Sequence, residues 1–249
     1  MPHSLFISDL HLCPTRPAIN ALFMRFVQDI APQAEALYIL GDFFEYWAGD
    51  DDLADPFHLT ITNALAGLAK QGTRVYIMHG NRDFLLSDAF MRAAQATLLP
   101  DPFLLDLYGT PTLLMHGDTL CTDDVAYQQF RIMVRSAEWQ RNFLTQPLNQ
   151  RKAQIDELRK RSAQEKSNKS AEIMDVNADA VASILRAQGY PRLIHGHTHR
   201  PARHVHTVDG KDCVRWVLAD WYATGSYLRC DTTGCVAHAM EKTPKPKHY

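Results

Sequence analysis

The sequence lacks the features that identify several classes of protein. Its 249 residues include only five cysteines, an odd number without a CxxC pair, so we expect neither a disulfide framework nor a cysteine zinc cluster. No apolar run approaches the ~18 residues that a membrane span requires. The N-terminus carries no basic stretch, and Asp9 interrupts its apolar run, so we expect no signal peptide. These absences favour the reducing cytoplasm and leave attachment to a membrane surface open.

The chain also lacks a strong net charge. The formal charge is −2, so no basic field indicates nucleic acid, and we expect none as a partner. A hydrophobic fraction of 46% and a charged fraction of 22% are typical of globular proteins. The length suits one large domain or two small ones. The one excess is histidine, with 12 residues, and histidine is the commonest metal ligand.

Short apolar runs alternate with helical patterns over the first 120 residues, which indicates an α/β fold. The strands expected there are Ser4–Ser8, Ala36–Leu40, Arg74–Met78 and Thr112–Met115, and the helices are Ala18–Ile30 and Phe57–Lys70. Strand patterns return at Leu193–Ile194, Val214–Ala219, Ser226–Cys230 and Val236–Met240. Asp209-Gly210 is typical of a two-residue hairpin turn.

Residues 123–190 differ from the rest because strand patterns vanish. Asp123 or Asp124 is placed to cap a helix, and Pro147 is placed to break it. Between Arg131 and Lys169 the sequence has ten Lys or Arg and four Asp or Glu, although the whole chain is slightly acidic. We therefore predict a core of residues 1–122 and 191–243, a helical cap inserted at 123–190, and a frayed tail at 244–249.

Five of the expected strands are each followed by residues that bind metal ions. The segments are Asp9-Leu10-His11, Gly41-Asp42, His79-Gly80-Asn81-Arg82-Asp83, His116-Gly117-Asp118 and His195-Gly196-His197-Thr198-His199. Any one of them alone is more typical of a turn or a helix cap. Because ligands in open α/β sheets bind beyond the carboxyl ends of the strands, we expect the five segments to converge. Together they predict a metal site.

This series of motifs resembles the calcineurin-like metallophosphoesterases. The resemblance implies an α/β metallophosphoesterase fold of two packed mixed β-sheets flanked by helices, with a dinuclear metal site at the strand ends. The segments SDLHLC, YILGDFFEYWAGDDD, HGNRDFLL, MHGDTLCTDD, SNKSAEIMDVNADAV and IHGHTHRPA further resemble the UDP-2,3-diacylglucosamine hydrolases of lipid A biosynthesis. Arg82 stands where many members of the wider superfamily have histidine, in agreement with this branch.

The resemblance also implies roles for individual residues. Asp42 would bridge two metal ions, with Asp9, His11 and His197 completing the first site and Asn81, His116 and His195 the second. Oxygen and nitrogen ligands suit Mn²⁺, Mg²⁺, Fe²⁺ or Zn²⁺, and the branch favours two Mn²⁺. Arg82 would stabilise phosphoryl charge beside Asp42, Asn81 and His116 in the catalytic set. His79 and His199 would support the ligands. The implied substrate contacts are Asn81, Arg82, Asp124, Ser162, Lys166, Lys169 and His195.

The implied reaction is metal-activated attack of water on the α-phosphorus of UDP-2,3-diacylglucosamine, which gives UMP and 2,3-diacylglucosamine 1-phosphate (lipid X). We expect a monomer bound peripherally to the cytoplasmic face of the bacterial inner membrane, where basic cap residues meet anionic lipid. Apolar cap residues would hold the acyl chains, namely Ile132, Met133, Val134, Trp139, Phe143, Leu144, Leu148, Ile155 and Leu158.

Three alternatives remain open at this point. The cap could be an ordinary solvated layer with a buried stripe. The enzyme could be another metallophosphoesterase, acting on a soluble nucleotide sugar or a cyclic nucleotide, which would need no apolar chamber. The chain could also be a non-enzymatic scaffold of the same fold, although all seven expected ligand positions carry competent residues.

Overall fold

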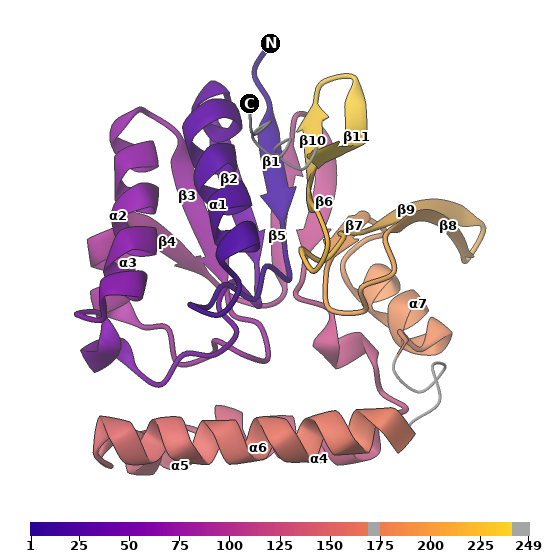
Figure 1. Cartoon of the computed structure of the whole chain (residues 1–249). Helices are drawn as coiled ribbons and strands as arrows, with labels where there is room; N and C mark the ends of the chain where they lie inside the picture. The colour runs from indigo at the N-terminus through magenta and orange to yellow at the C-terminus, as the bar shows by residue number, and fades with distance from the viewer. Residues whose placement is uncertain (169–174, 241–249) are drawn as a thin grey trace, which may run out of the picture.

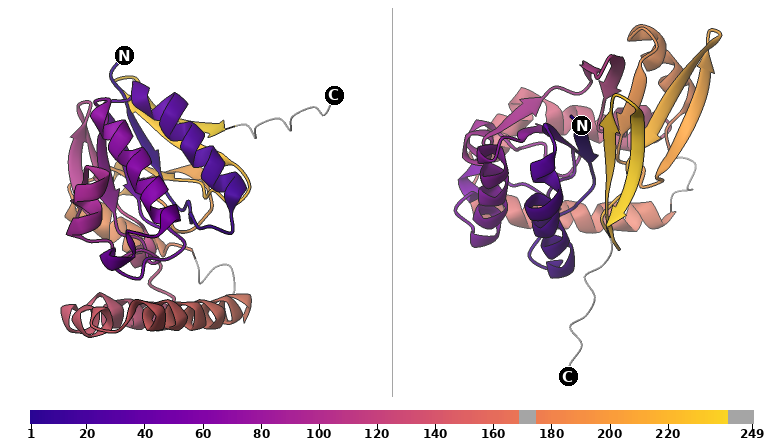
Figure 2. Two further views of the ribbon diagram at one scale, coloured as in Figure 1. Left: turned by 60° about the vertical axis from the view of Figure 1, so that its left-hand side comes forward. Right: turned by 90° about the horizontal axis from the view of Figure 1, so that it is seen from above.

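The computed structural model describes residues 1–168 and 175–240, with the backbone alone for 161–168. Two β-sheets pack face to face, and helices cover their outer faces (Figures 1 and 2). Leu40 and Met78 of one sheet share a buried cluster with Leu114 and Ile194 of the other, so one core layer lies between the sheets. The larger buried cluster lies between the first sheet and the helices on its outer face. This α/β architecture confirms the fold class expected from the sequence.

The first sheet has the strand order β11-β10-β1-β2-β3-β4. Strands β1 (Ser4–Ile7), β2 (Ala36–Leu40), β3 (Arg74–Met78) and β4 (Ala96–Leu99) are parallel, and β10 (Gly225–Asp231) and β11 (Gly234–Met240) form an antiparallel edge. The outer face is covered by α1 (Pro17–Arg25), α2 (Pro56–Lys70) and α3 (Asp88–Ala94). Short helical turns occupy Phe26–Ile30, Ala31–Gln33, Asp50–Asp52 and Asp118–Leu120.

The second sheet has the order β5-β6-β7-β9-β8. Its strands are β5 (Phe103–Leu107), β6 (Thr110–Leu114), β7 (Arg192–His195), β8 (Ala202–Val208) and β9 (Lys211–Val217). Strands β6, β7 and β9 are parallel, and β8 returns to β9 through Asp209-Gly210, the expected hairpin turn. Helix α7 (Ala178–Ala187) packs on the outer face of this sheet through Val181 and Leu185.

Three helices form a separate layer across the carboxyl ends of the strands (Figure 1). They are α4 (Val125–Arg135), α5 (Ala137–Leu144) and α6 (Leu148–Asn168). The Asp124 carboxylate accepts a hydrogen bond from Tyr127 N at 3.1 Å and so caps α4. Helix α7, which the sequence pattern grouped with this layer, lies on the second sheet instead. Among the described helices, none combines the length and the apolar composition that crossing a bilayer requires.

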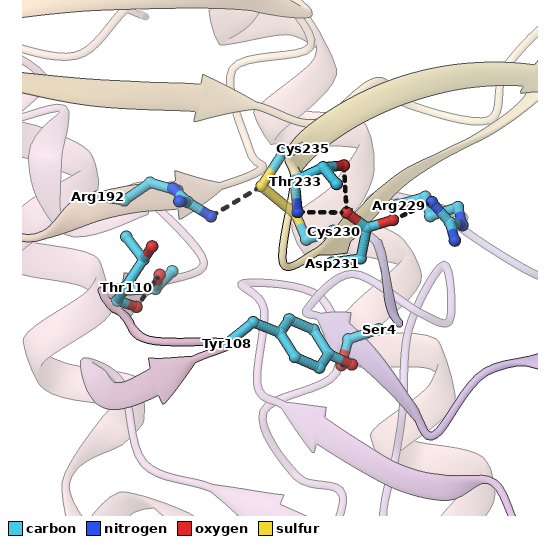
Figure 3. The surroundings of a disulfide bond; sticks show 10 residues. Ser4, Tyr108, Thr110, Arg192, Arg229, Cys230, Asp231, Thr233 and Cys235 are labelled. Carbon is cyan, nitrogen blue, oxygen red and sulfur yellow. Dashed lines mark hydrogen bonds and ion pairs between the residues drawn. A yellow bond between two sulfur atoms is a disulfide. The ribbon is translucent and has the colours of Figure 1, made fainter. Parts of the chain in front are cut away.

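A disulfide joins Cys230 to Cys235, which the sequence analysis did not expect (Figure 3). The two cysteines face each other across the β10–β11 hairpin, with their Cα atoms 4.1 Å apart. Arg192 donates to Cys235 Sγ at 2.9 Å. The odd cysteine count argued against a framework of several bridges, but the segment CDTTGC places one pair on a tight hairpin. Of the described cysteines, Cys13, Cys121 and Cys213 form no disulfide.

Candidate metal centre

The loops that follow β1, β2, β3, β6 and β7 meet at one end of the two sheets. Asp9 N donates to Gly41 O at 3.1 Å, which joins the loops after β1 and β2. Gly196 N donates to His116 O at 2.9 Å, which joins the loops after β6 and β7. The two sheets are linked because His197 N donates to Asp9 Oδ2 at 2.8 Å. The convergence expected from the strand ends is therefore present.

The candidate ligands share an uncommon backbone conformation. Nine non-glycine residues of the described chain have positive φ angles, and five of them are Asp9 (57°), His11 (50°), Asp42 (51°), His197 (68°) and His199 (54°). This conformation is uncommon for residues with a side chain and persists only where the surroundings enforce it. Its concentration among the polar loop residues supports a functional site.

Glycine allows the loops to approach each other closely. A Cβ atom on Gly80 would overlap the backbone nitrogen of Asp42, and one on Gly196 would overlap the Ser8 hydroxyl. The glycines of these motifs therefore leave room for the loops to pack against one another.

Asp9, His11 and His199 form the first group of potential ligands. Each offers one atom, and these atoms all lie within 4.8 Å of one another. Asp9 Oδ1 lies 3.3 Å from His199 Nε2. Asp9 Oδ1 and both ring nitrogens of His11 are buried and lack a hydrogen-bond partner. Because unpaired buried polar atoms are costly, this arrangement fits a bound cation.

The second group consists of Asp9, Asp42 and His116. His116 Nδ1 lies 2.9 Å from the Leu40 carbonyl and donates to it, so Nε2 is the ring nitrogen that faces the site, 3.8 Å from Asp42 Oδ1. Asn81 Oδ1 lies 3.1 Å from this Nε2 and 2.9 Å from His197 Nδ1. Oxygen and nitrogen atoms from five loops thus surround one small volume, without a thiolate. Such a donor set suits a divalent cation of the Mn²⁺, Mg²⁺, Fe²⁺ or Zn²⁺ type.

Close packing of charged groups shifts their pKa values. Burial raises the pKa of Asp42 to about 7, and the nearby carboxylates of Asp9 and Asp83 add to this shift. Burial opposes protonation of His116, yet Asp42, Asp118 and Asp9 raise its pKa to about 9. The carboxylates therefore make this site electronegative, which favours binding of a cation.

His195, expected as a ligand, is occupied by other partners. Arg215 donates to His195 Nε2 at 3.0 Å, and His195 Nδ1 lies 2.9 Å from the Gly196 carbonyl. Burial and the Arg215 charge lower the pKa of His195 to about 3. Neither ring nitrogen has a lone pair left for a metal or a substrate. His199, expected only in support, faces Asp9, so the geometry favours His199 over His195 as a ligand.

The remaining expected residues lie in different places. Arg82 N donates to Asp42 Oδ1 at 2.8 Å, and Arg82 lines the cavity described below. Asp124 also lines that cavity. His79 Nε2 lies 2.7 Å from the Leu86 carbonyl and supports the loop after β3. The side chains of Ser162, Lys166 and Lys169 lie outside the described residues.

Three further residues of the site were missed as functional groups. The Asp83 carboxylate accepts hydrogen bonds from Phe43 N (2.7 Å) and Gly80 N (2.8 Å) and ties two ligand loops together. Glu45 Oε2 lies 3.5 Å from His11 Nδ1, and Oε1 lies 2.7 Å from Arg159 on α6. The Tyr127 ring lies beside His197. Asp83 belongs to a recognised motif, whereas Tyr127 sits in a helix where sequence offers no signal.

A cavity of about 640 Å³ separates the ligand loops from the cap helices. Its polar lining includes Asn81, Arg82, Asp124, His197 and His199. Its apolar part is lined by Phe84, Leu85, Phe130, Val134, Trp139, Phe143, Ile155 and Leu158. One cavity therefore joins a candidate metal centre to an apolar chamber.

Not every apolar cap residue faces this cavity. Val134 on α4 lines it, whereas Ile132 and Met133 on the same helix are 71% and 50% exposed. Leu144 on α5 is also exposed, and Leu148 does not line the cavity. Helical periodicity explains the difference, because neighbours in sequence point to different sides of a helix.

Comparison with known proteins agrees with the geometry. Residues 3–201 match the family model of the calcineurin-like phosphoesterases. A UDP-2,3-diacylglucosamine hydrolase of Aromatoleum aromaticum is 56% identical, with 93% of this chain and 94% of the relative covered. Proteins of the same name from Pseudomonas paraeruginosa and Aeromonas salmonicida are 50% and 49% identical, covering 92% and 91% of this chain and 95% and 89% of the relatives.

The family-model match makes the chain a member of the calcineurin-like phosphoesterases, a class of metal-dependent hydrolases. Within that class it belongs to the family of the UDP-2,3-diacylglucosamine hydrolases. The resemblance found in the sequence motifs is thereby confirmed.

Proposed function

We propose that this protein hydrolyses the pyrophosphate of UDP-2,3-diacylglucosamine in lipid A biosynthesis. Water attacks the α-phosphorus, and the products are UMP and 2,3-diacylglucosamine 1-phosphate (lipid X). The observation that carries this proposal is the cavity that joins the ligand cluster to the apolar chamber under the cap. A lipid with a pyrophosphate headgroup matches both parts of this cavity.

The proposed cofactor is a pair of divalent ions, with Mn²⁺ favoured. Asp9, His11, Asp42 and His199 would hold one ion, and Asp42, Asn81, His116 and His197 would hold the other. Two bound divalent ions supply charge stabilisation for the phosphoryl group and lower the pKa of water toward neutrality. The buried unpaired atoms of Asp9 and His11 support this assignment.

The chain's own residues orient the substrate around this centre. Arg82 contacts the phosphoryl oxygens, because guanidinium forms strong paired hydrogen bonds to phosphate. Its backbone nitrogen meanwhile holds Asp42 in place. Asp124, at the cavity wall, contacts the substrate, and Ser162, Lys166 and Lys169, whose side chains lie outside the described residues, are further proposed contacts. The cap helices exclude water from the acyl chains.

The cap also suggests where the protein works. Its excess of basic residues favours peripheral binding to an anionic surface, which we place at the cytoplasmic face of the bacterial inner membrane. We propose that the protein acts there as a monomer. A soluble nucleotide sugar would leave the apolar chamber unfilled, so the alternative of a soluble substrate is not favoured.

An isotope experiment tests the reaction. UDP-2,3-diacylglucosamine is incubated with the protein and Mn²⁺ in H₂¹⁸O, with and without a chelator. We expect ¹⁸O in UMP, no label in the lipid phosphate and no product with chelator. Label in the lipid phosphate would place the attack at the β-phosphorus, and absence of product with Mn²⁺ would refute the proposed function.

A further inference from the structure

We propose that Arg215 is a positioning residue for the metal centre. It holds His195, which in turn supports the loop that carries His197 and His199. This inference rests on the metal centre proposed above. Arg215 lies on β9 beside β7, and only 6% of its surface is exposed. Its guanidinium contacts two histidines, with Nη1 3.0 Å from His195 Nε2 and Nε 2.9 Å from His206 Nε2.

These contacts determine the tautomer of His195. A guanidinium has only donors, so His195 Nε2 must accept. In a neutral ring the proton then lies on Nδ1, from which it is donated to the Gly196 carbonyl at 2.9 Å. A chain of hydrogen bonds therefore runs from β9 through His195 to the backbone of the ligand loop.

The Gly196 carbonyl closes a strained turn. It accepts a second hydrogen bond, from Thr198 N at 2.8 Å, and this bond spans three residues with His197 in the middle at φ 68°. A γ-turn with a positive central φ is rare and strained. Since His197 sits at the centre of the turn and His199 follows it, the turn determines where both side chains point.

Loss of Arg215 would release this arrangement. The His195 proton could then move to Nε2, which would direct the Nδ1 lone pair at the Gly196 carbonyl oxygen. Two acceptors 2.9 Å apart repel each other, and the strained turn would lose part of its support. The predicted consequence is weaker metal binding, although Arg215 itself touches no proposed ligand.

Titration of the metal-free protein with Mn²⁺ tests this inference without any lipid substrate. We expect Arg215→Met to weaken Mn²⁺ binding by ~10–100-fold, the usual effect of removing a residue that orients ligands. Arg215→Lys retains one donor and should recover part of the affinity. Arg192→Met is the matched control, because Arg192 lies on the adjacent β7 but contacts Cys235, away from the loop.

A second measurement uses the unaltered protein and does not depend on how the variants fold. Nitrogen-15 NMR of the Mg²⁺-loaded protein should show the His195 proton on Nδ1. Protonation at Nε2, coordination of His195 to the ion, or equal Mn²⁺ affinity of wild type and Arg215→Met would each overturn the role of Arg215. If the wild type binds no ion at all, the proposed metal centre fails as well, so the two failures are distinguishable.

Discussion

Single side chains at the metal centre are held mainly by the backbone. Asp42 Oδ1 accepts from Arg82 N, Asp9 Oδ2 accepts from His197 N, and His116 Nδ1 donates to Leu40 O. In each case another polar atom of the same side chain remains directed toward the centre. The ligands are therefore held in place by hydrogen bonds within the protein, and substitution of one ligand should remove an ion without unfolding the protein.

The choice between His199 and His195 leads to a prediction about stoichiometry. We expect His199→Ala to bind one ion instead of two, because it removes the ring nitrogen that lies 3.3 Å from Asp9 Oδ1 in the first group of ligands. His195→Asn should still bind two ions, because the Asn amide can replace the Nδ1 donor to the Gly196 carbonyl. We expect its affinity to be lower than that of the wild type. Elemental analysis after dialysis against Mn²⁺ measures both. The opposite pattern, with His195→Asn losing one ion and His199→Ala retaining two, would restore His195 as the ligand.

Arg82 should matter for turnover and not for metal content. We expect Arg82→Ala to lower kcat by ~100-fold or more, as removal of one transition-state donor does. Arg82→Lys should lower it less, because lysine keeps the charge but cannot form the paired contact. Steady-state kinetics with metal analysis of each variant checks this. Loss of Mn²⁺ from Arg82→Ala would show that Arg82 mainly supports the site.

The sequence of the last motif does not distinguish between two possible pairs of ligand histidines. His195, His197 and His199 alternate, so two overlapping H-x-H pairs fit the same pattern. Only the position of Arg215, 16 residues beyond His199 in the chain and adjacent in the sheet, shows that His195 is engaged elsewhere. Asp9, His11, Asp42, Asn81 and His116, by contrast, follow strands whose ends the sequence predicted, and the structure brings them together.

Among the elements, α6 is fastened to the core near its start. Arg151 is almost fully buried, and its guanidinium donates to the Ala48 carbonyl, the Gln146 carbonyl and the Asp51 carboxylate. Gly49 has a φ of 132°, and a Cβ atom there would overlap the guanidinium, so glycine is needed at this contact. Lys152 adds an ion pair to Asp52 at 2.7 Å. The cap is thus tied to the loop after β2 by charged contacts.

Removing this contact should loosen the cap without unfolding the sheets. Loss of a buried charged donor costs ~1.5–3 kcal/mol, so Arg151→Met should speed amide exchange in α5 and α6 by ~10–100-fold. Exchange in β1, β2 and β3 should stay at the wild-type rate. Arg141→Met, at an exposed position on α5, is the control and should change neither. Uniformly faster exchange throughout the protein would show that Arg151 stabilises the whole fold.

The elements themselves were predicted unevenly, for physical reasons. Strands β1, β2 and β3 are buried, and their continuous apolar runs were recognised within one residue. Strand β8 was missed because it is an edge strand whose side chains are mostly exposed and polar. Helix α7 was grouped with the cap because the segment 123–190 shows no strand pattern, and only packing reveals that Val181 and Leu185 cover the second sheet.

In the whole molecule, the candidate site lies between two layers, which are the β-sheets and the cap helices. The sheets bring the ligand loops together at one end, and α4, α5 and α6 cross that end (Figures 1 and 2). Asp118 connects them, because its buried carboxylate accepts from Tyr127 at 2.6 Å and from Arg131 at 2.7 Å, both on α4. The space left between the layers is lined by both charged and apolar side chains, which suits a lipid with a phosphorylated headgroup.

This arrangement predicts strong selectivity for the acylated substrate. Each methylene withdrawn from water contributes ~0.8 kcal/mol, so burial of about four methylenes already corresponds to ~100-fold in kcat/KM. We therefore expect UDP-2,3-diacylglucosamine to exceed its deacylated analogue by at least ~100-fold. Trp139→Ser and Leu158→Ser, which alter the cavity lining, should reduce this ratio, whereas hydrolysis of a small soluble phosphodiester should persist. Ile132→Ser, on the exposed side of α4, is the control and should leave the ratio unchanged. A wild-type ratio near one would mean that the cap does not recognise acyl chains, and a soluble nucleotide sugar would then become the better substrate.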